Sequence, residues 1–321
     1  MAVMHTMNLL QKDICNSFST ILKQVVEVQK YFRDVHMAHG LLKEKGGCMP
    51  QLPNETQWNS QVACIETYQK NYNFYVEIYG EKMEDFPANI GRIIENIAIK
   101  REASCLLSQM KKLGIALDKM QSDSCHLSDT VHIWYSLIKD EELSIYYDAI
   151  KKRFQDAVQP FHILAYITDH RYVDDYKSFI DNDNENSAEQ WLEDRNPDFL
   201  GLLYKFNLKD REVFPKQMFS ESLMVISPSE WWNIMKGKVT RSQIRDKEVS
   251  ANFCSFLASL HSCPASSASI ERWFSTFRFV WSKIRNRLGA DKAMKLVKTY
   301  KSFHNSSAAD SSSCNDIESD Q

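Results

Sequence analysis

The chain has 321 residues, of which 43% are hydrophobic and 25% charged, and its formal net charge is −3. This balance is typical of a soluble globular protein and argues against a general nucleic-acid binder. No apolar run approaches the roughly 20 residues that a membrane-spanning helix needs, and no signal peptide is recognisable. The eight cysteines show no CxxC spacing, so we expect free thiols and an intracellular protein.

Glycine and proline are scarce, with 9 and 8 residues, so the predicted fold class is mainly α. Over residues 4–42, apolar side chains recur three and four residues apart, which predicts one helical run. A second helical region is predicted from 58 to about 172, with breaks near Pro87 and at 122–123. Within it, residues 163–167 are the best strand candidate, although a helix fits them nearly as well.

The pattern changes after this region. Residues 181–196 are acidic and polar and are predicted to form a surface loop. Helical spacing continues to about Phe214, and Ser229 is the expected N-cap of a Trp-rich helix. Residues 305–321 carry almost no large apolar side chain and are expected to be disordered. A further helix is predicted from an apolar stripe made of Phe253, Phe256, Leu257 and Leu260.

A second apolar stripe follows a break at Cys263 and Pro264. So many large apolar groups cannot stay solvated on one helix, so this chain or another must cover them. Between Glu271 and Lys301, nine Lys and Arg stand against two acids, a local charge of +7. That charge fits either a solvated helical face or a surface for an acidic partner. The stripe consists of Ile270, Trp273, Phe274, Phe277, Trp281, Ile284 and Leu288.

This part of the chain contains Pro264, Ser267, Glu271, Arg272, Phe274, Ser275, Arg285, Arg287 and Leu288. In that order and spacing they resemble the dimerisation region of hAT-superfamily transposases, the relatives of the hobo and Activator elements. Four other segments are similar to motifs of that family and occur in the family's order. They are MHTMNLLQKDI (4–14), NETQWNS (54–60, with Gln57 where Arg is usual), VQPFHILAYITDHRY (158–172) and SPSEWW (227–232).

The resemblance implies an RNase H-like domain that is interrupted by a large helical insertion. In the family, two aspartates on the sheet and one glutamate on a helix after the insertion hold the catalytic metals. Glu271 matches the glutamate, whereas both aspartates belong upstream of these residues, so no catalysis and no cofactor are expected. The implied parts are a remnant helix of the RNase H-like domain at 1–45, the helical insertion at 54–248, the dimerisation region at 249–304 and the tail at 305–321.

We therefore expect a non-catalytic, transposase-derived protein, nuclear by analogy with the family, that forms a homo-oligomer through its second apolar stripe. No membrane partner and no small-molecule substrate are expected. No metal is expected either, since His36 and His39 lack further ligands at zinc spacing. With the sheet incomplete, apolar faces along residues 9–28 are expected to lie uncovered.

Two alternatives remain open. One is a nucleic-acid-binding protein that uses the basic segment 272–301, with DNA as a candidate partner. The other is a fragment of an intact DNA transposase, truncated at its N-terminus. The candidate nucleic-acid contacts are Trp58, Arg272, Arg285 and Arg287.

Overall fold

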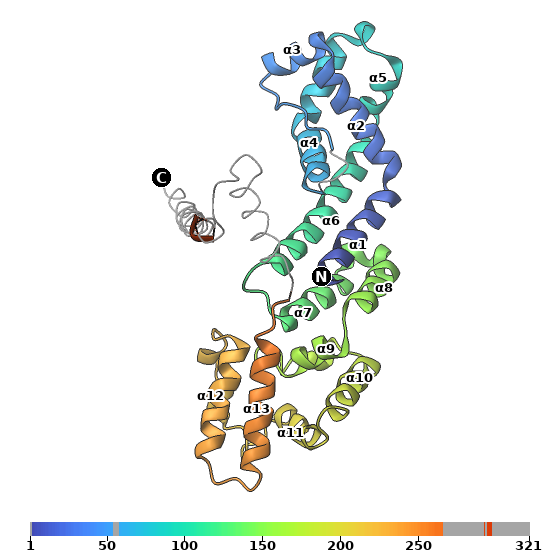
Figure 1. Ribbon diagram of the computed structural model, residues 1–321. Helices are drawn as coiled ribbons and strands as arrows, with labels where there is room; N and C mark the ends of the chain where they lie inside the picture. The colour runs from blue at the N-terminus through green and yellow to red at the C-terminus, as the bar shows by residue number, and fades with distance from the viewer. Residues whose placement is uncertain (1, 54–57, 266–291, 293, 297–321) are drawn as a thin grey trace. The chain divides into compact units, whose positions relative to one another are not determined.

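The computed structural model describes residues 2–53, 58–265, 292 and 294–296, and these residues are mainly α-helical (Figure 1). The chain divides into two compact units, residues 1–265 and 266–321. In the second unit, residues 292 and 294–296 are helical. Within the described ranges, the one pairing of strand type is an isolated bridge between His126 and Pro264. The predicted mainly α class is therefore confirmed.

The described part of the first unit contains thirteen α-helices and five short 3-10 segments. In chain order they are α1 (Ala2–Ser17), α2 (Ser19–Asp34), α3 (His36–Glu44), α4 (Trp58–Glu81), η1 (Met83–Asp85), α5 (Ala88–Glu95), α6 (Ile97–Gln121), α7 (Leu127–Ile138), η2 (Glu141–Tyr146), α8 (Tyr147–Ala157), α9 (Pro160–Ile167), η3 (Tyr176–Ser178), α10 (Asn182–Glu193), α11 (Asp198–Asn207), η4 (Lys216–Phe219), η5 (Glu221–Leu223), α12 (Pro228–Arg241) and α13 (Lys247–His261). None of these helices combines the length and the apolar character that crossing a bilayer requires.

Buried side chains of the first unit form two hydrophobic cores. The N-terminal core is built mainly by α2 to α5, and the C-terminal core by α1 and by α7 to α13. Helix α6 contributes to both, because its buried residues form one continuous stripe at helical spacing. The stripe gives Ile99, Ala103, Leu106 and Met110 to the N-terminal core, and Leu113, Ala116, Leu117 and Met120 to the C-terminal core.

The N-terminal region departs from expectation in two ways. The single helix predicted over residues 4–42 is divided into α1, α2 and α3, with breaks at Phe18 and Val35. Both break residues pack against the N-terminal core, so each interruption keeps an apolar side chain inside. The apolar faces along residues 9–28 are not uncovered. Leu10, Ile14, Val25 and Val28 are fully buried, because α1 packs against α6 and α8, and α2 against α3 to α6.

Two segments of the C-terminal core also differ from their sequence predictions. The predicted loop at 181–196 is instead helix α10, whose N-cap Asp181 accepts a hydrogen bond from the Asn184 amide at 2.9 Å. Its polar composition misleads because α10 buries only Ala188 and Leu192 and exposes its other faces. The strand candidate 163–167 is part of helix α9. All five residues are buried, and this removes the periodicity that distinguishes the two structures.

Helices α12 and α13 lie side by side as a helical hairpin (Figure 1). The predicted stripe is confirmed in α13, where Phe253, Leu257 and Leu260 are buried. The predicted cap of α12 is wrong: the N-cap is Ser227, two residues before Ser229. Ser227 accepts from the Glu230 amide while Glu230 accepts in return, and Pro228 occupies the first helical position. Ser229 instead donates to the Ala258 carbonyl at 2.8 Å and ties the hairpin together.

Candidate functional site

The site residues predicted from the sequence lie outside the described residues. This holds for Glu271, for Arg272, Arg285 and Arg287, and for the whole apolar stripe from Ile270 to Leu288. Trp58 opens helix α4, and its side chain likewise lies outside the described part. Their roles stay predictions, and the site is built here from the residues that the structure describes.

Two segments that are far apart in the sequence, 168–172 and 227–232, interlock in the C-terminal core. The indole N–H of Trp232 donates to the Thr168 carbonyl at 3.0 Å. The imidazole of His170 stacks on Trp231, with 5.2 Å between ring centres and 10° between planes. Capping at Ser227 fixes where α12 starts and thereby aims both tryptophans at the turn that follows α9.

A buried carboxylate lies at the centre of that turn. Asp169 has no exposed side-chain surface, yet it accepts hydrogen bonds from Ser128 Oγ at 2.6 Å and from Arg171 Nη2 at 2.7 Å. Burial raises the pKa of this carboxyl, but the hydrogen bonds and the charge of Arg171 outweigh burial and bring the pKa below its ordinary value. Asp169 is therefore ionised at neutral pH and paired inside the protein.

Arg171 extends this contact into the Asp169 network, which we define as Ser128, Asp129, Asp169, Arg171 and Tyr172. Its Nη2 atom also lies 2.8 Å from Asp129 Oδ1, and the Tyr172 hydroxyl donates to the same oxygen at 2.8 Å. The second oxygen of Asp129 accepts from the His126 amide at 2.8 Å, which caps α7. The network thus fastens the start of α7 to the turn after α9.

His261, at the end of α13, contacts the same turn through Thr168. The Thr168 hydroxyl gives its proton to the Leu164 carbonyl at 2.7 Å, so its 3.1 Å contact with His261 Nε2 requires that nitrogen to carry the hydrogen. His261 Nδ1 is buried and has no hydrogen-bond partner within the described structure. A proton added there would bring an unpaired charge into the core, and burial accordingly lowers the pKa of His261 to about 4.

Burial of histidines makes the stability of the protein fall in acid, and His261 is one of two described histidines with a strongly lowered pKa. Burial also lowers the pKa of His162 to about 4, from the usual 6.5. Because both folded values lie below the unfolded value, the unfolded chain takes up protons first, and stability falls as the pH drops from about 6.5 to 4. We expect each histidine to cost on the order of 2 kcal/mol between pH 7 and pH 5, measured by urea unfolding at each pH.

The variant His261→Gln keeps a side-chain donor for Thr168 but cannot take up a proton. We expect it to remove the contribution of His261, about 2 kcal/mol between pH 7 and pH 5. An unfolding free energy of the natural chain that is unchanged between pH 7 and pH 5 would contradict the assignment.

The Asp169 network is suited to holding the fold rather than to chemistry. Its central carboxylate is sealed and fully engaged, and no group of three metal-ligating side chains lies together in the described ranges. Three other carboxylates form ion pairs with distant segments: Asp13 with Arg153 at 2.7 Å, Glu66 with Lys111 at 2.7 Å and Glu77 with Lys45 at 2.6 Å.

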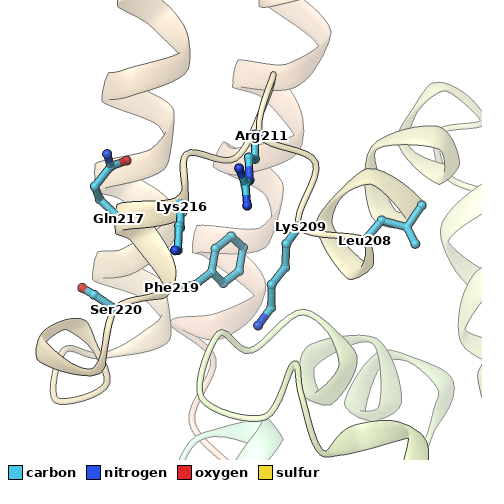
Figure 2. A pocket seen from close by; sticks show the side chains of 7 residues that line it. All are labelled: Leu208, Lys209, Arg211, Lys216, Gln217, Phe219 and Ser220. Carbon is cyan, nitrogen blue, oxygen red and sulfur yellow. The ribbon is translucent and has the colours of Figure 1, made fainter.

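A cavity of about 540 Å³ opens between the end of α11 and η4. Figure 2 shows Lys209, Arg211 and Lys216 around the ring of Phe219. Sequence reasoning missed this site because Asp210 and Glu212 alternate with Lys209 and Arg211 and cancel their charge along the chain. The cavity lining separates the two signs, since its members are Leu208, Lys209, Arg211, Lys216, Gln217, Phe219 and Ser220.

Compared with known proteins, the chain matches no family model and no curated protein.

Proposed function

We propose that this chain is a non-catalytic, transposase-derived protein that associates with itself through the apolar stripe from Ile270 to Leu288. The observation that carries the proposal is where the stripe lies. The chain divides after residue 265, and the stripe falls in the second unit, residues 266–321, which is short enough to bury only a small core by itself. Seven large apolar side chains at helical spacing therefore suit an interface between copies, in which Trp and Phe serve as anchors.

The Asp169 network supports the transposase-like ancestry. Three of its residues, Asp169, Arg171 and Tyr172, are those that match the Leu-Asp-Pro-Arg-Tyr motif of the hAT superfamily. They make one hydrogen-bonded cluster, and the neighbouring turn residues contact the tryptophans of the SPSEWW segment. Residues that carry the resemblance in two distant segments thus share one structural role. An RNase H-like origin of residues 1–45 and nuclear residence belong to the same proposal.

That the protein is non-catalytic is proposed from the number of metal-binding carboxylates that the resemblance supplies. Strand cleavage with divalent metals needs carboxylates that converge from separate elements. Within these 321 residues the resemblance supplies one of the three family acids, Glu271, and a single carboxylate does not hold such a site. We therefore interpret Glu271 as a residue inherited from a catalytic ancestor that no longer binds metal.

The test is the absolute mass of the full chain, measured by light scattering on a sizing column over a hundredfold range of concentration. We expect a discrete dimer or a larger closed oligomer. Phe274→Asp should shift it to monomer, because a carboxylate cannot be desolvated in an apolar interface without a partner. Ile145→Asp is the matched control, since Ile145 is 70% exposed on η2 and its replacement should leave the mass unchanged.

A monomeric natural chain, or an oligomer that Phe274→Asp leaves intact, would show that the stripe is not the interface. The same samples also test the alternative function, nucleic-acid binding, when they are titrated with duplex DNA at several salt concentrations. Duplex binding by residues 272–301 would weaken steeply with salt, as counterion release requires.

A further inference from the structure

The cavity beside α11 is formed by a short, tightly folded stretch of chain. Helix α11 ends at Asn207, and Lys209 follows with a positive φ of 51°, which turns the backbone sharply. The chain then returns through Pro215 into η4, whose Met218 is buried in the C-terminal core. The walls of the cavity are thus anchored at both ends, so its cations are held near one another by the backbone.

The charge of the lining is unbalanced. Three of its seven side chains are cations and none is a carboxylate. Lys209 is paired with Asp174 outside the cavity. For Arg211 and Lys216, the described part of the chain offers no carboxylate within ion-pair distance, and both are exposed. Gln217 and Ser220 add hydrogen-bond donors that can serve an anion.

The aromatic ring of Phe219 is held in place between the cations. It contacts Trp231 at 5.6 Å and Phe206 at 5.8 Å between ring centres, which fixes its position against the core. Its remaining surface is open to the cavity, with Lys209 Nζ 5.1 Å from the ring centre. An aromatic surface bordered by cations is the arrangement that proteins use to stack a base beside its phosphate.

The size of the cavity selects among anions. Its 540 Å³ falls in the range of small-molecule sites, about 300–1,000 Å³, and is far more than one inorganic phosphate fills. We propose that this cavity binds a nucleoside phosphate, with the phosphate between Arg211 and Lys216 and the base against Phe219. This binding is independent of self-association, because none of these residues belongs to the stripe at 270–288.

Isothermal titration of the full chain with AMP, adenosine and inorganic phosphate tests the proposal at low salt. We expect AMP to bind with a Kd of about 1 mM or tighter, and each of its two parts alone to bind at least about tenfold more weakly. The double variant Arg211→Ala/Lys216→Ala should weaken AMP binding by about tenfold or more. Phe219→Leu should weaken AMP but leave inorganic phosphate unchanged.

The matched control is Lys70→Ala/Arg92→Ala, which removes the same charge from exposed positions of α4 and α5 and should leave AMP binding unchanged. Competition by a 5′-phosphorylated oligothymidylate against AMP would identify a strand end as the source of the nucleotide, and its absence a free nucleotide. AMP that fails to bind, that binds no better than phosphate, or that weakens equally in the control variant overturns the proposal.

Discussion

Replacing Arg171 by leucine is expected to lower the free energy of unfolding by about 3–5 kcal/mol, because breaking a buried ion pair leaves an uncompensated charge. The charge left behind is that of Asp169, whose side chain has no exposed surface. Without the guanidinium, burial would outweigh the hydrogen bonds that remain from Ser128 Oγ and the Arg171 backbone amide, so the pKa of the carboxyl would rise and part of the loss would be recovered at lower pH. Urea unfolding followed by far-UV circular dichroism measures the effect.

A second arginine provides the comparison. Arg153 also bridges two helices by pairing with Asp13, but the Asp13 side chain is 42% exposed. Arg153→Leu should therefore cost about 1 kcal/mol or less. Adding Asp169→Asn to Arg171→Leu should restore part of the stability, because the remaining buried group is neutral. Equal losses for the two arginine variants would show that burial of the Asp169 network carries no energetic weight.

Replacing Trp232 by alanine should lower the free energy of unfolding by about 3–5 kcal/mol, the usual cost of removing a large aromatic side chain from a core. Trp232 is fully buried and packs against Phe206, Phe253 and Trp231 at 5.0, 5.6 and 4.9 Å between ring centres. Alanine would leave a cavity where α11, α12 and α13 meet. Chemical unfolding of the purified variant reports the loss.

Trp232→Phe separates packing from hydrogen bonding. It retains most of the aromatic volume but leaves the Thr168 carbonyl without its indole donor, so a loss of about 1–3 kcal/mol is expected. The half-buried Trp191, which is covered on one face by the Arg195 guanidinium, should tolerate alanine better than Trp232 does. If Trp191→Ala were the more damaging change, Trp232 would not be the centre of the C-terminal core.

The sequence predicts the helical class because its signal is local. The stripe on α13 and the breaks near Pro87 and after Gln121 follow from spacing and from helix-breaking residues alone. Spacing does not identify helices α9 and α10, and the reasons for the two failures are opposite. One is buried on every side and shows no polar face, whereas the other buries so little that its apolar positions are lost among the acids.

The Asp169 network could be predicted only in part. The segment 168–172 stands out through its resemblance to a family motif, but its partners Ser128 and Asp129 lie about forty residues earlier, at the start of another helix. Nothing in the local sequence pairs them. The basic cavity is missed for a related reason: alternating charges cancel along the chain, and only the turn at Lys209 separates them in space.

The shared helix α6 has a consequence for how the chain emerges from the ribosome. Apart from Cys15 at the end of α1, the N-terminal core draws on residues from Val25 to Met110, so it can assemble before α7 has been made. The inner face of α1 cannot, because Met7, Leu10 and Ile14 belong to the core that later helices complete. Helix α1 is therefore synthesised before the N-terminal core but covered only after the later helices have been made. During translation the apolar face of α1 stays exposed and prone to aggregation, and chaperones protect such surfaces.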